Sequence, residues 1–406
     1  MAAKYARITL SFTATWTKGK DAVSANYCAD YEAQPSAGCA FFCGVTHFPN
    51  KKIPRNLYRY LTTQTATMYK ALLPSFLFAI LFASCQQQPQ PQTDAPQPTA
   101  CEYLDYTTND AVQAGGIHMV KLKEGYQVWT KRIGNSPTMK VLLLHGGPAG
   151  THELMIAFES FFPQANIELY QYDQLGSYYS DQPDDMSLWT IARFVEEVEQ
   201  VRLDLGLDST NFFLLGQSWG GILAMEYALK YQQNLKGLIV SNMTADFDKY
   251  EAYNNKLRAE LPKDVLDTLS FYESKEQFQN PRYLDLMYTA FYKKHICRLE
   301  PWPEPVERSF GHFNQVVYEY MQGPSEFVPG GILKGWSVWE RLKELTVPTL
   351  MIGAKYDSMN PAEMEEMSHL VQNGSYLYCA NGSHLCQWDD QQTYMKGVIS
   401  WIQGVK

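Results

Sequence analysis

The sequence of 406 residues lacks several features that whole classes of protein require. Its eight cysteines include no C-x-x-C pair, so the ligand spacing of common zinc sites is missing and we expect no metal. Its 34 lysines and arginines are outnumbered by 43 aspartates and glutamates, and the net charge is −9. Nucleic-acid binding needs clustered positive charge, so we expect no nucleic-acid partner. The sequence does not decide whether Cys379 and Cys386 form a disulfide. An oxidising compartment would allow the bond, but the sequence does not give the geometry that it needs.

The apolar run at residues 71–83 is too short to span a bilayer comfortably. The short positive segment Met68-Tyr69-Lys70 precedes this run and small residues end it, which is the pattern of a secretory signal. The ending Phe82-Ala83-Ser84-Cys85 resembles the cleavage box of bacterial lipoproteins, which usually has leucine in place of Phe82. The resemblance implies that Cys85 becomes the lipidated first residue. The alternative is a buried core helix in a longer protein.

The segments on either side of this run carry no sustained apolar period. We expect residues 1–67 to be absent from the mature protein because translation starts at Met68, and residues 68–85 to be the signal. The Gln- and Pro-rich residues 86–105 would form a disordered tether. Together these features predict an exported cell-envelope lipoprotein, in the periplasm or outer membrane of a bacterium, that contacts the membrane through its lipid anchor only.

From Gly116 onward, short apolar runs alternate with segments of helical period. This alternation predicts an α/β body with a mostly parallel sheet and helices on both faces. The expected strands are residues 117–122, 126–132, 139–144, 167–172, 211–215, 238–241, 347–353 and 376–379, and the clearest helices are 188–205 and 222–230. Residues 106–245 and 340–406 would form this body. Residues 246–339 interrupt it with helical stretches, Pro-rich turns and aromatics, and predict a mainly helical cap over a site.

The segment 216–220 reads Gly-Gln-Ser-Trp-Gly, a G-x-S-x-G motif between a predicted strand and a predicted helix. Glycines flank Ser218 because the turn is too sharp for bulky neighbours. The turn would present the Ser218 hydroxyl at the carboxyl edge of the sheet, above a helix N-terminus with free N–H groups and positive potential. We therefore expect Ser218 to be a nucleophile. The alternative is a Gly-rich packing turn with an incidental serine.

Two backbone N–H groups are candidate donors to the oxyanion that attack by Ser218 would create. One belongs to Trp219, and the other to Gly147, in the segment His145-Gly146-Gly147-Pro148 that follows a predicted strand. Losing one such donor typically costs about 3 kcal/mol of transition-state stabilisation. The alternative for the Gly-Gly segment is an ordinary tight turn.

An acid and a histidine each follow a late strand. Asp357 comes soon after the strand at 347–353, and His384 after the strand at 376–379. Both loops should lie at the edge that carries Ser218, because parallel strands end together. Asp357 would fix the tautomer of His384, and His384 would take the proton of Ser218. The weaker histidine candidates lie in an apparent helix or in the insertion: His369, His295 and His312.

From about Gly116 to the C-terminus, the chain resembles the prolyl aminopeptidase (proline iminopeptidase) family of serine peptidases, which have the α/β-hydrolase fold. The segments that carry the resemblance are residues 145–150, 173–177, 216–221, 323–327, 356–357 and 383–384. The resemblance implies release of an N-terminal residue, preferably proline, from short peptides with a free N-terminus, without a cofactor or metal. It also implies that Glu326 binds the protonated amine through charge-assisted hydrogen bonds. The alternative is a solvated surface glutamate.

The chain departs from the family pattern at three places. Ser358 stands where some relatives have a second glutamate, which weakens the expected amine site and leaves the choice of peptide over ester or amide open. Ala149 stands where glycine is usual, and Tyr178-Tyr179 where small residues are common, so both could reshape the pocket.

Two other functions therefore stay open. An esterase or amidase for another small acyl substrate would hydrolyse simple esters without cleaving proline anilides. A non-catalytic surface binding protein could keep a hydrolase body, but retention of Ser218, Asp357 and His384 disfavours it. Hydrolases of this fold with a carboxylate nucleophile are disfavoured by Ser218.

Overall fold

The computed structural model describes residues 8–15, 24–31, 43–47 and 114–406. The chain divides into two units, residues 1–93 and 94–406. The first contains an antiparallel sheet of β1 (Ile8–Thr15), β2 (Ser24–Tyr31) and β3 (Cys43–His47). The expectation of no strand pattern in residues 1–67 was therefore wrong. Apolar residues at 8, 10, 12 and 14 alternate with polar ones, and this period of two favours a strand. The predicted signal, Cys85 and the tether lie outside the described residues.

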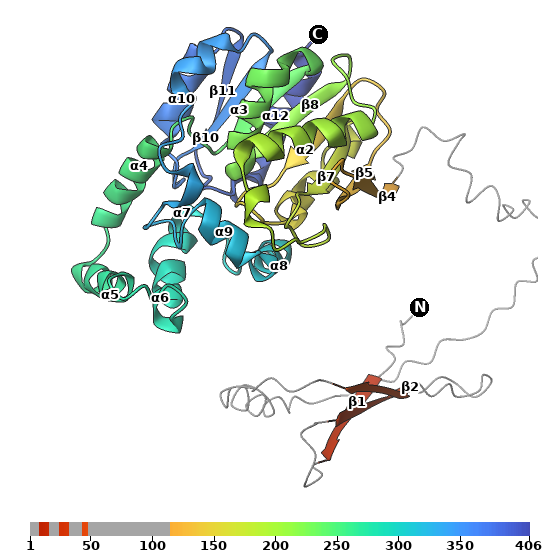
Figure 1. Ribbon diagram of the computed structural model, residues 1–406, viewed down its shortest axis with the longest axis vertical. Helices are drawn as coiled ribbons and strands as arrows, with labels where there is room; N and C mark the ends of the chain where they lie inside the picture. The colour runs from red at the N-terminus through yellow and green to blue at the C-terminus, as the bar shows by residue number, and fades with distance from the viewer. Residues whose placement is uncertain (1–7, 16–23, 32–42, 48–113) are drawn as a thin grey trace, which may run out of the picture. The chain divides into compact units, whose positions relative to one another are not determined.

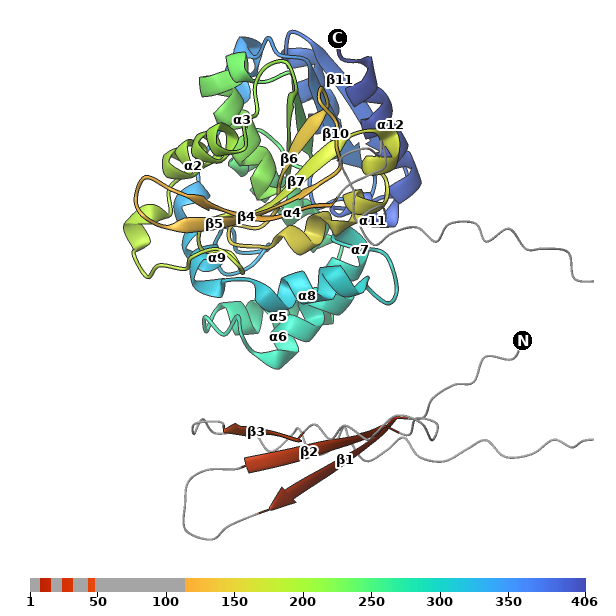
Figure 2. The same cartoon turned by 90° about the vertical axis from the view of Figure 1, so that its right-hand side faces the viewer.

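An eight-stranded sheet organises the second unit (Figures 1 and 2). Its strands are β4 (Ala114–Lys121), β5 (Gln127–Ile133), β6 (Lys140–Leu144), β7 (Glu168–Asp173), β8 (Phe212–Gln217), β9 (Gly237–Ser241), β10 (Thr349–Ala354) and β11 (Gly374–Cys379). The order is β11-β10-β9-β8-β6-β7-β5-β4, and only β5 pairs antiparallel, with β4 and β7. The predicted mostly parallel sheet is confirmed.

The central strands are continuous apolar runs because both faces of the sheet are covered. Along β6, Leu142 and Leu144 face one core cluster, whereas Val141 and Leu143 face the other. One face is covered by α2 (Ile191–Asp204), α3 (Trp219–Tyr231) and α10 (Pro361–Leu370), and the other by η2 (His152–Ser160), α11 (Cys386–Asp389) and α12 (Gln391–Gly404) (Figure 2). With both faces covered, the site forms at the edge where the parallel strands β6, β8, β9, β10 and β11 end.

The chain from Phe247 to Glu344, between β9 and β10, is mainly helical, as predicted, and we call it the cap. It contains α4 (Phe247–Ala259), α5 (Lys263–Glu273), α6 (Pro281–Leu286), the π-helix η6 (Met287–Tyr292), α7 (Lys293–His295), α8 (Glu304–His312) and α9 (Gln315–Met321), followed by the 3-10 turns η7 (Gly331–Leu333) and η8 (Trp339–Glu344). The cap has a small apolar core of its own, around Leu269, Tyr283 and Phe291. Its helices gather at one end of the sheet (Figure 1).

Short 3-10 turns complete the second unit: η3 (Pro163–Ala165), η4 (Met186–Leu188) and η5 (Gln232–Asn234). In the part of the chain that the structure describes, no helix is long and apolar enough to cross a membrane. Within the same residues, no cluster of three or more His, Cys, Asp or Glu is placed to hold a metal ion.

Candidate active site

Ser218 lies in a sharp turn between β8 and α3. Its φ of 56° and ψ of −125° place a non-glycine residue in a strained conformation, which persists only where the surroundings enforce it. The neighbours enforce it closely, since a Cβ atom at Gly216 would lie 1.9 Å from the carbonyl oxygen of Gly220. A Cβ atom at Gly220 would lie 2.2 Å from the Leu144 oxygen at the end of β6. The two glycines of the motif are therefore required by packing, and the half-buried Ser218 stays accessible at the sheet edge.

The Gly-Gly turn after β6 packs directly against Ser218. A Cβ atom at Gly146 would come within 2.9 Å of the Ser218 Cβ. Gly147 has φ 55° and accepts a 2.7 Å bond from the N–H of Gly150, which closes the turn. Trp219 is the first residue of α3, so its N–H has no acceptor within the helix. Both predicted oxyanion donors thus lie beside the serine.

Buried polar side chains brace these two turns. Burial lowers the pKa of His145 to about 4, so its imidazole is neutral. Its Nδ1 is 3.1 Å from the Gly146 oxygen, and its Nε2 accepts a 3.3 Å bond from the N–H of Gln174. The Gln174 side chain in turn accepts a 2.8 Å bond from the indole of Trp219. The loops after β6 and β7 therefore hold the N-terminus of α3 in place.

Asp357 and His384 meet at the same sheet edge, in the loops after β10 and β11. The Oδ1 of Asp357 lies 2.8 Å from the Nδ1 of His384 and also accepts a 3.0 Å bond from the N–H of Met359. Asp357 is fully buried and His384 nearly so. The Gln217 side chain donates a 3.1 Å bond to the His384 oxygen, so the residue before Ser218 is tied to the histidine loop.

The electrostatic surroundings favour the protonated form of His384. Burial alone would lower the pKa of this imidazole, but the charge and hydrogen bond of Asp357 and the charge of Glu326 outweigh it, and the pKa is raised above its ordinary value. An imidazole that readily holds a proton and lines the same cavity as Ser218 suits a general base that later acts as a general acid.

A cavity of about 320 Å³ opens over these groups, within the usual range for small-molecule sites. Ser218, His384 and Gly147 form one side, and cap residues, Glu326 among them, form the other. Three predicted site residues from separate loops and the predicted amine-binding residue from the cap therefore share one cavity.

Comparison with known proteins identifies the family. A sequence model of the α/β hydrolase fold matches residues 140–391. The proline iminopeptidase of Flavobacterium johnsoniae is 57% identical over 281 residues, which cover 69% of this chain and 95% of the relative. The chain belongs to the proline iminopeptidase family.

Solved structures of similar proteins have the same fold as this chain. The crystal structure of VinJ is similar with a TM-score of 0.69 and 31% identity, and it covers 72% of this chain and all of its own. The proline iminopeptidase of Mycobacterium smegmatis is similar with a TM-score of 0.65 and 27% identity, over 71% of this chain and 98% of its own. The predicted fold and family are confirmed.

The carboxylate of Glu326 is held by tyrosine hydroxyls within this proline iminopeptidase fold. Tyr318, on α9, donates a 2.7 Å bond to one oxygen, and Tyr250, on α4, donates to the other. Burial and the nearby Glu326 charge raise the pKa of both tyrosines, so both stay protonated donors. Glu326 is half-buried and lines the cavity, unlike the solvated surface glutamate that was its alternative.

The three departures from the family pattern do not lie in the cavity wall. Ser358 is fully buried beneath it, which leaves Glu326 as the one carboxylate among the described residues that line the cavity. Ala149 adopts φ 59°, a conformation that favours glycine, and accepts a 3.1 Å bond from the N–H of Asn314. Tyr178 stacks on His312 of the cap with ring centroids 3.9 Å apart. The tyrosine pair therefore supports the cap rather than shaping the pocket.

Asn242 is a site residue that sequence reasoning missed. It directly follows β9, and its Nδ2 donates a 2.7 Å bond to the Oδ2 of Asp357. Its Oδ1 accepts bonds from the hydroxyl of Ser241 (2.6 Å) and the thiol of Cys386 (3.1 Å), which orient the amide toward Asp357. A partial signal was present in the sequence, because Asn242 comes after a parallel strand at the same edge, but it did not show that β9 lies beside β10.

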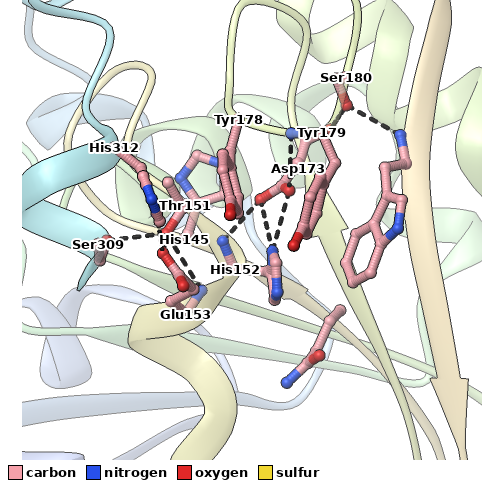
Figure 3. Close-up of polar contacts among 12 residues, drawn as sticks. His145, Thr151, His152, Glu153, Asp173, Tyr178, Tyr179, Ser180, Ser309 and His312 are labelled. Atoms are coloured by element: carbon pink, nitrogen blue, oxygen red, sulfur yellow. Dashed lines mark hydrogen bonds and ion pairs between the residues drawn. The ribbon is translucent and has the colours of Figure 1, made fainter. Parts of the chain in front are cut away.

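A second missed group joins the cap to the core (Figure 3). The buried carboxylate of Glu153, on η2, contacts Arg308 Nε at 2.7 Å and His312 Nδ1 at 2.8 Å, both on α8. The hydroxyls of Thr151 and Ser309, the latter also on α8, lie 2.9 Å apart and share a hydrogen bond. We call Thr151, Glu153, Arg308, Ser309 and His312 the latch. It fixes α8, whose Phe310 lines the cavity.

Cys379 and Cys386 are both buried free thiols in the structure. Burial and the neighbouring Cys379 raise the pKa of Cys386, so its thiol stays protonated and remains a donor to Asn242. The disulfide that the sequence left open is therefore not formed in this structure.

Proposed function

We propose that the protein is a serine aminopeptidase that releases N-terminal proline, or a similar small residue, from short peptides through an acyl-enzyme on Ser218. The observation that carries the proposal is that His384, which Asp357 contacts at 2.8 Å, lines one cavity with Ser218 and Glu326. The 57% identity to a curated proline iminopeptidase supports the same activity and its preference for proline.

In the proposed reaction, His384 takes the proton from the Ser218 hydroxyl as the oxygen attacks the carbonyl carbon. Asp357 keeps His384 in the tautomer that leaves Nε2 free to accept this proton, because Asp357 contacts Nδ1. The N–H groups of Gly147 and Trp219 stabilise the oxyanion, each by about 3 kcal/mol in comparable enzymes.

Collapse of this intermediate breaks the peptide C–N bond, and His384 gives its proton to the departing nitrogen. Water then attacks the ester carbon while His384 takes one of its protons. The bond from this carbon to the Ser218 oxygen breaks, and His384 returns the proton to that oxygen, which releases the amino acid. Every step uses side chains and N–H groups of the chain itself.

Glu326 supplies the aminopeptidase specificity in this proposal. A protonated proline nitrogen has two N–H donors, and a carboxylate held by two tyrosine hydroxyls is a fixed acceptor for them. A substrate with a blocked nitrogen would leave Glu326 desolvated without a partner, which is costly for a charge.

Three substrates test the proposal: proline 4-nitroanilide, its N-acetyl derivative and 4-nitrophenyl acetate. We expect turnover of the free anilide and little of the blocked one. Glu326→Gln should lower kcat/KM for the free anilide by roughly 10- to 100-fold, the usual worth of a hydrogen bond to a charged group. Acetate ester turnover should change little. Glu340→Gln, which alters an exposed carboxylate outside the cavity lining, is the control. Strong ester turnover with no anilide turnover would instead favour an esterase or amidase.

We also propose that the mature protein begins at a lipidated Cys85 and is exported to the cell envelope. The support is the sequence pattern of residues 68–85 followed by a Gln- and Pro-rich tether. Mass spectrometry of the N-terminal peptide from the membrane fraction tests this. An N-terminus upstream of Cys85 would contradict it.

A further inference from the structure

The position of His384 identifies the side of the cavity on which the leaving peptide lies. When the C–N bond breaks, the departing nitrogen takes the proton that His384 holds, so the residue after that bond must lie beside this imidazole. The free amine of the first residue lies toward Glu326 instead. The two ends of the cavity therefore contact different parts of the substrate.

The wall beside His384 is apolar and tied to the histidine loop. The N–H of Leu385 donates a 2.9 Å bond to the Ile296 oxygen, and the N–H of His384 donates a 2.9 Å bond to the His295 oxygen. Leu154, Ile296 and Leu385 belong to one apolar cluster and line the cavity. The leaving peptide therefore meets hydrocarbon next to the imidazole.

Two further apolar side chains at the cavity remain open to water. Phe310, next to this cluster, is 37% exposed, and Leu284 is 47% exposed, although both line the cavity. The ring of Phe310 packs 5.0 Å from that of Trp302, a member of the apolar cluster. A ligand that covers exposed apolar surface at a cavity wall gains binding free energy, because that surface is removed from water.

The same cavity offers a substrate carboxylate no permanent cation, because His384 must be uncharged when it takes the Ser218 proton. Among the described residues that line it there is no lysine or arginine, and the charged side chain is that of Glu326. The C-terminal carboxylate of a dipeptide would lie on the second residue, beside the apolar wall. It would lose hydration there, gain no ion pair and be repelled by Glu326.

We propose that this site selects peptides whose second residue is apolar and carries no free carboxylate, which are peptides of three or more residues or C-terminal amides. The preference rests on the proposed function, because it assigns the leaving peptide of that reaction to the wall around His384. Phe310 is its main specificity-determining residue, since it is exposed, lines the cavity and packs on Trp302 of the apolar cluster beside His384.

The test compares kcat/KM for Pro-Leu-NH2, Pro-Gly-NH2 and Pro-Leu. Pro-Leu-NH2 should exceed each of the others by roughly tenfold or more, the size of discrimination by one apolar group in a pocket. Phe310→Ala should reduce the Leu over Gly ratio, and Phe310→Lys should raise Pro-Leu relative to its amide. Phe271→Ala and Phe271→Lys are matched controls, because Phe271 is 51% exposed on α5 and does not line the cavity.

Equal turnover of Pro-Leu and Pro-Leu-NH2, or of the Leu and Gly amides, would overturn the preference while leaving the aminopeptidase intact. If the Phe310 and Phe271 variants had the same Leu over Gly ratio and the same ratio of Pro-Leu to its amide, Phe310 would not determine specificity, and the proposal would be overturned. Turnover of 4-nitrophenyl acetate with none of the three peptides would contradict the proposed function, and the preference with it.

Discussion

The sheet edge and the cap build the same cavity by different means. At the edge, Ser218, Gly147 and Trp219 are positioned by backbone turns that allow almost no variation, because added Cβ atoms at the glycines would overlap carbonyl oxygens or side chains. In the cap, Glu326 lies in a turn and is positioned by the hydroxyls of Tyr250 on α4 and Tyr318 on α9. The turns at the edge are specified by local sequence, whereas the position of Glu326 depends on side-chain contacts, one of them with a residue 76 positions away.

This difference assigns separate tasks to the two regions. The edge supplies the proposed bond-breaking groups, and changes there should lower kcat. The cap supplies walls and the amine acceptor, and changes there should act on KM and on substrate choice. The variants below test that division, in order of decreasing expected effect.

The largest effect should follow Asp357→Asn. An asparagine keeps the shape but favours the wrong tautomer of His384, and the equivalent change in a well-studied serine protease lowers kcat about 10⁴-fold. We expect a loss of that order for proline 4-nitroanilide, with a melting temperature close to that of the wild type. A kcat within tenfold of wild type would remove Asp357 from the proposed role.

A smaller effect should follow Asn242→Ala, which removes the 2.7 Å bond to Asp357. A hydrogen bond to a charged group is worth about 1.5–3 kcal/mol, so kcat should fall roughly 10- to 100-fold with KM unchanged. The less neutralised carboxylate should also move the acid limb of the pH profile upward. Asn211→Ala, a buried asparagine at the opposite end of β8, is the control. Equal effects of the two changes would make Asn242 merely structural.

These two variants also show what sequence could and could not reveal. Ser218 and Asp357 each follow a fully buried strand, and His384 follows the edge strand β11, so the rule that parallel strands end together was enough to group them. The role of Asn242 depends on β9 lying beside β10, an order that periodicity does not give. Glu153 and Arg308 are 155 positions apart, and no local pattern links them.

A cap effect should follow Glu153→Gln, which weakens the latch. We expect KM to rise roughly three- to tenfold with little change in kcat, the scale for a partly exposed ion pair with good geometry. Glu199→Gln is the matched control, since that carboxylate pairs with Arg202 far from the cap. A rise in KM for both variants, or for neither, would break the division between regions.

The latch should also depend on pH. Burial opposes the ionised form of Glu153, but bonds from His312, Arg308 and Thr151 lower its pKa below the ordinary 4.5. A lowered folded pKa means that the contribution to stability is present above pH 4.5 and is lost as pH falls through the folded value. Wild type should therefore lose more stability than Glu153→Gln on acidification, as measured by melting temperature. Equal losses would contradict the role of this carboxylate.

The smallest effect concerns the pH profile of ester hydrolysis, where no substrate amine is involved. The raised pKa of His384 places the acid limb of kcat/KM above pH 6.5. Glu326→Gln removes a negative charge that helps to raise this pKa, so the limb should move to lower pH. An unmoved or upward-moved limb would contradict the inference that the Glu326 charge raises the pKa of His384.

The central claim is that the Ser218 hydroxyl is the group that becomes acylated. Labelling the full chain with a fluorophosphonate and locating the adduct by peptide mass spectrometry measures this. The account predicts one adduct, on Ser218, with neither label nor anilide turnover in Ser218→Ala. An adduct elsewhere, or turnover that survives Ser218→Ala, would contradict it.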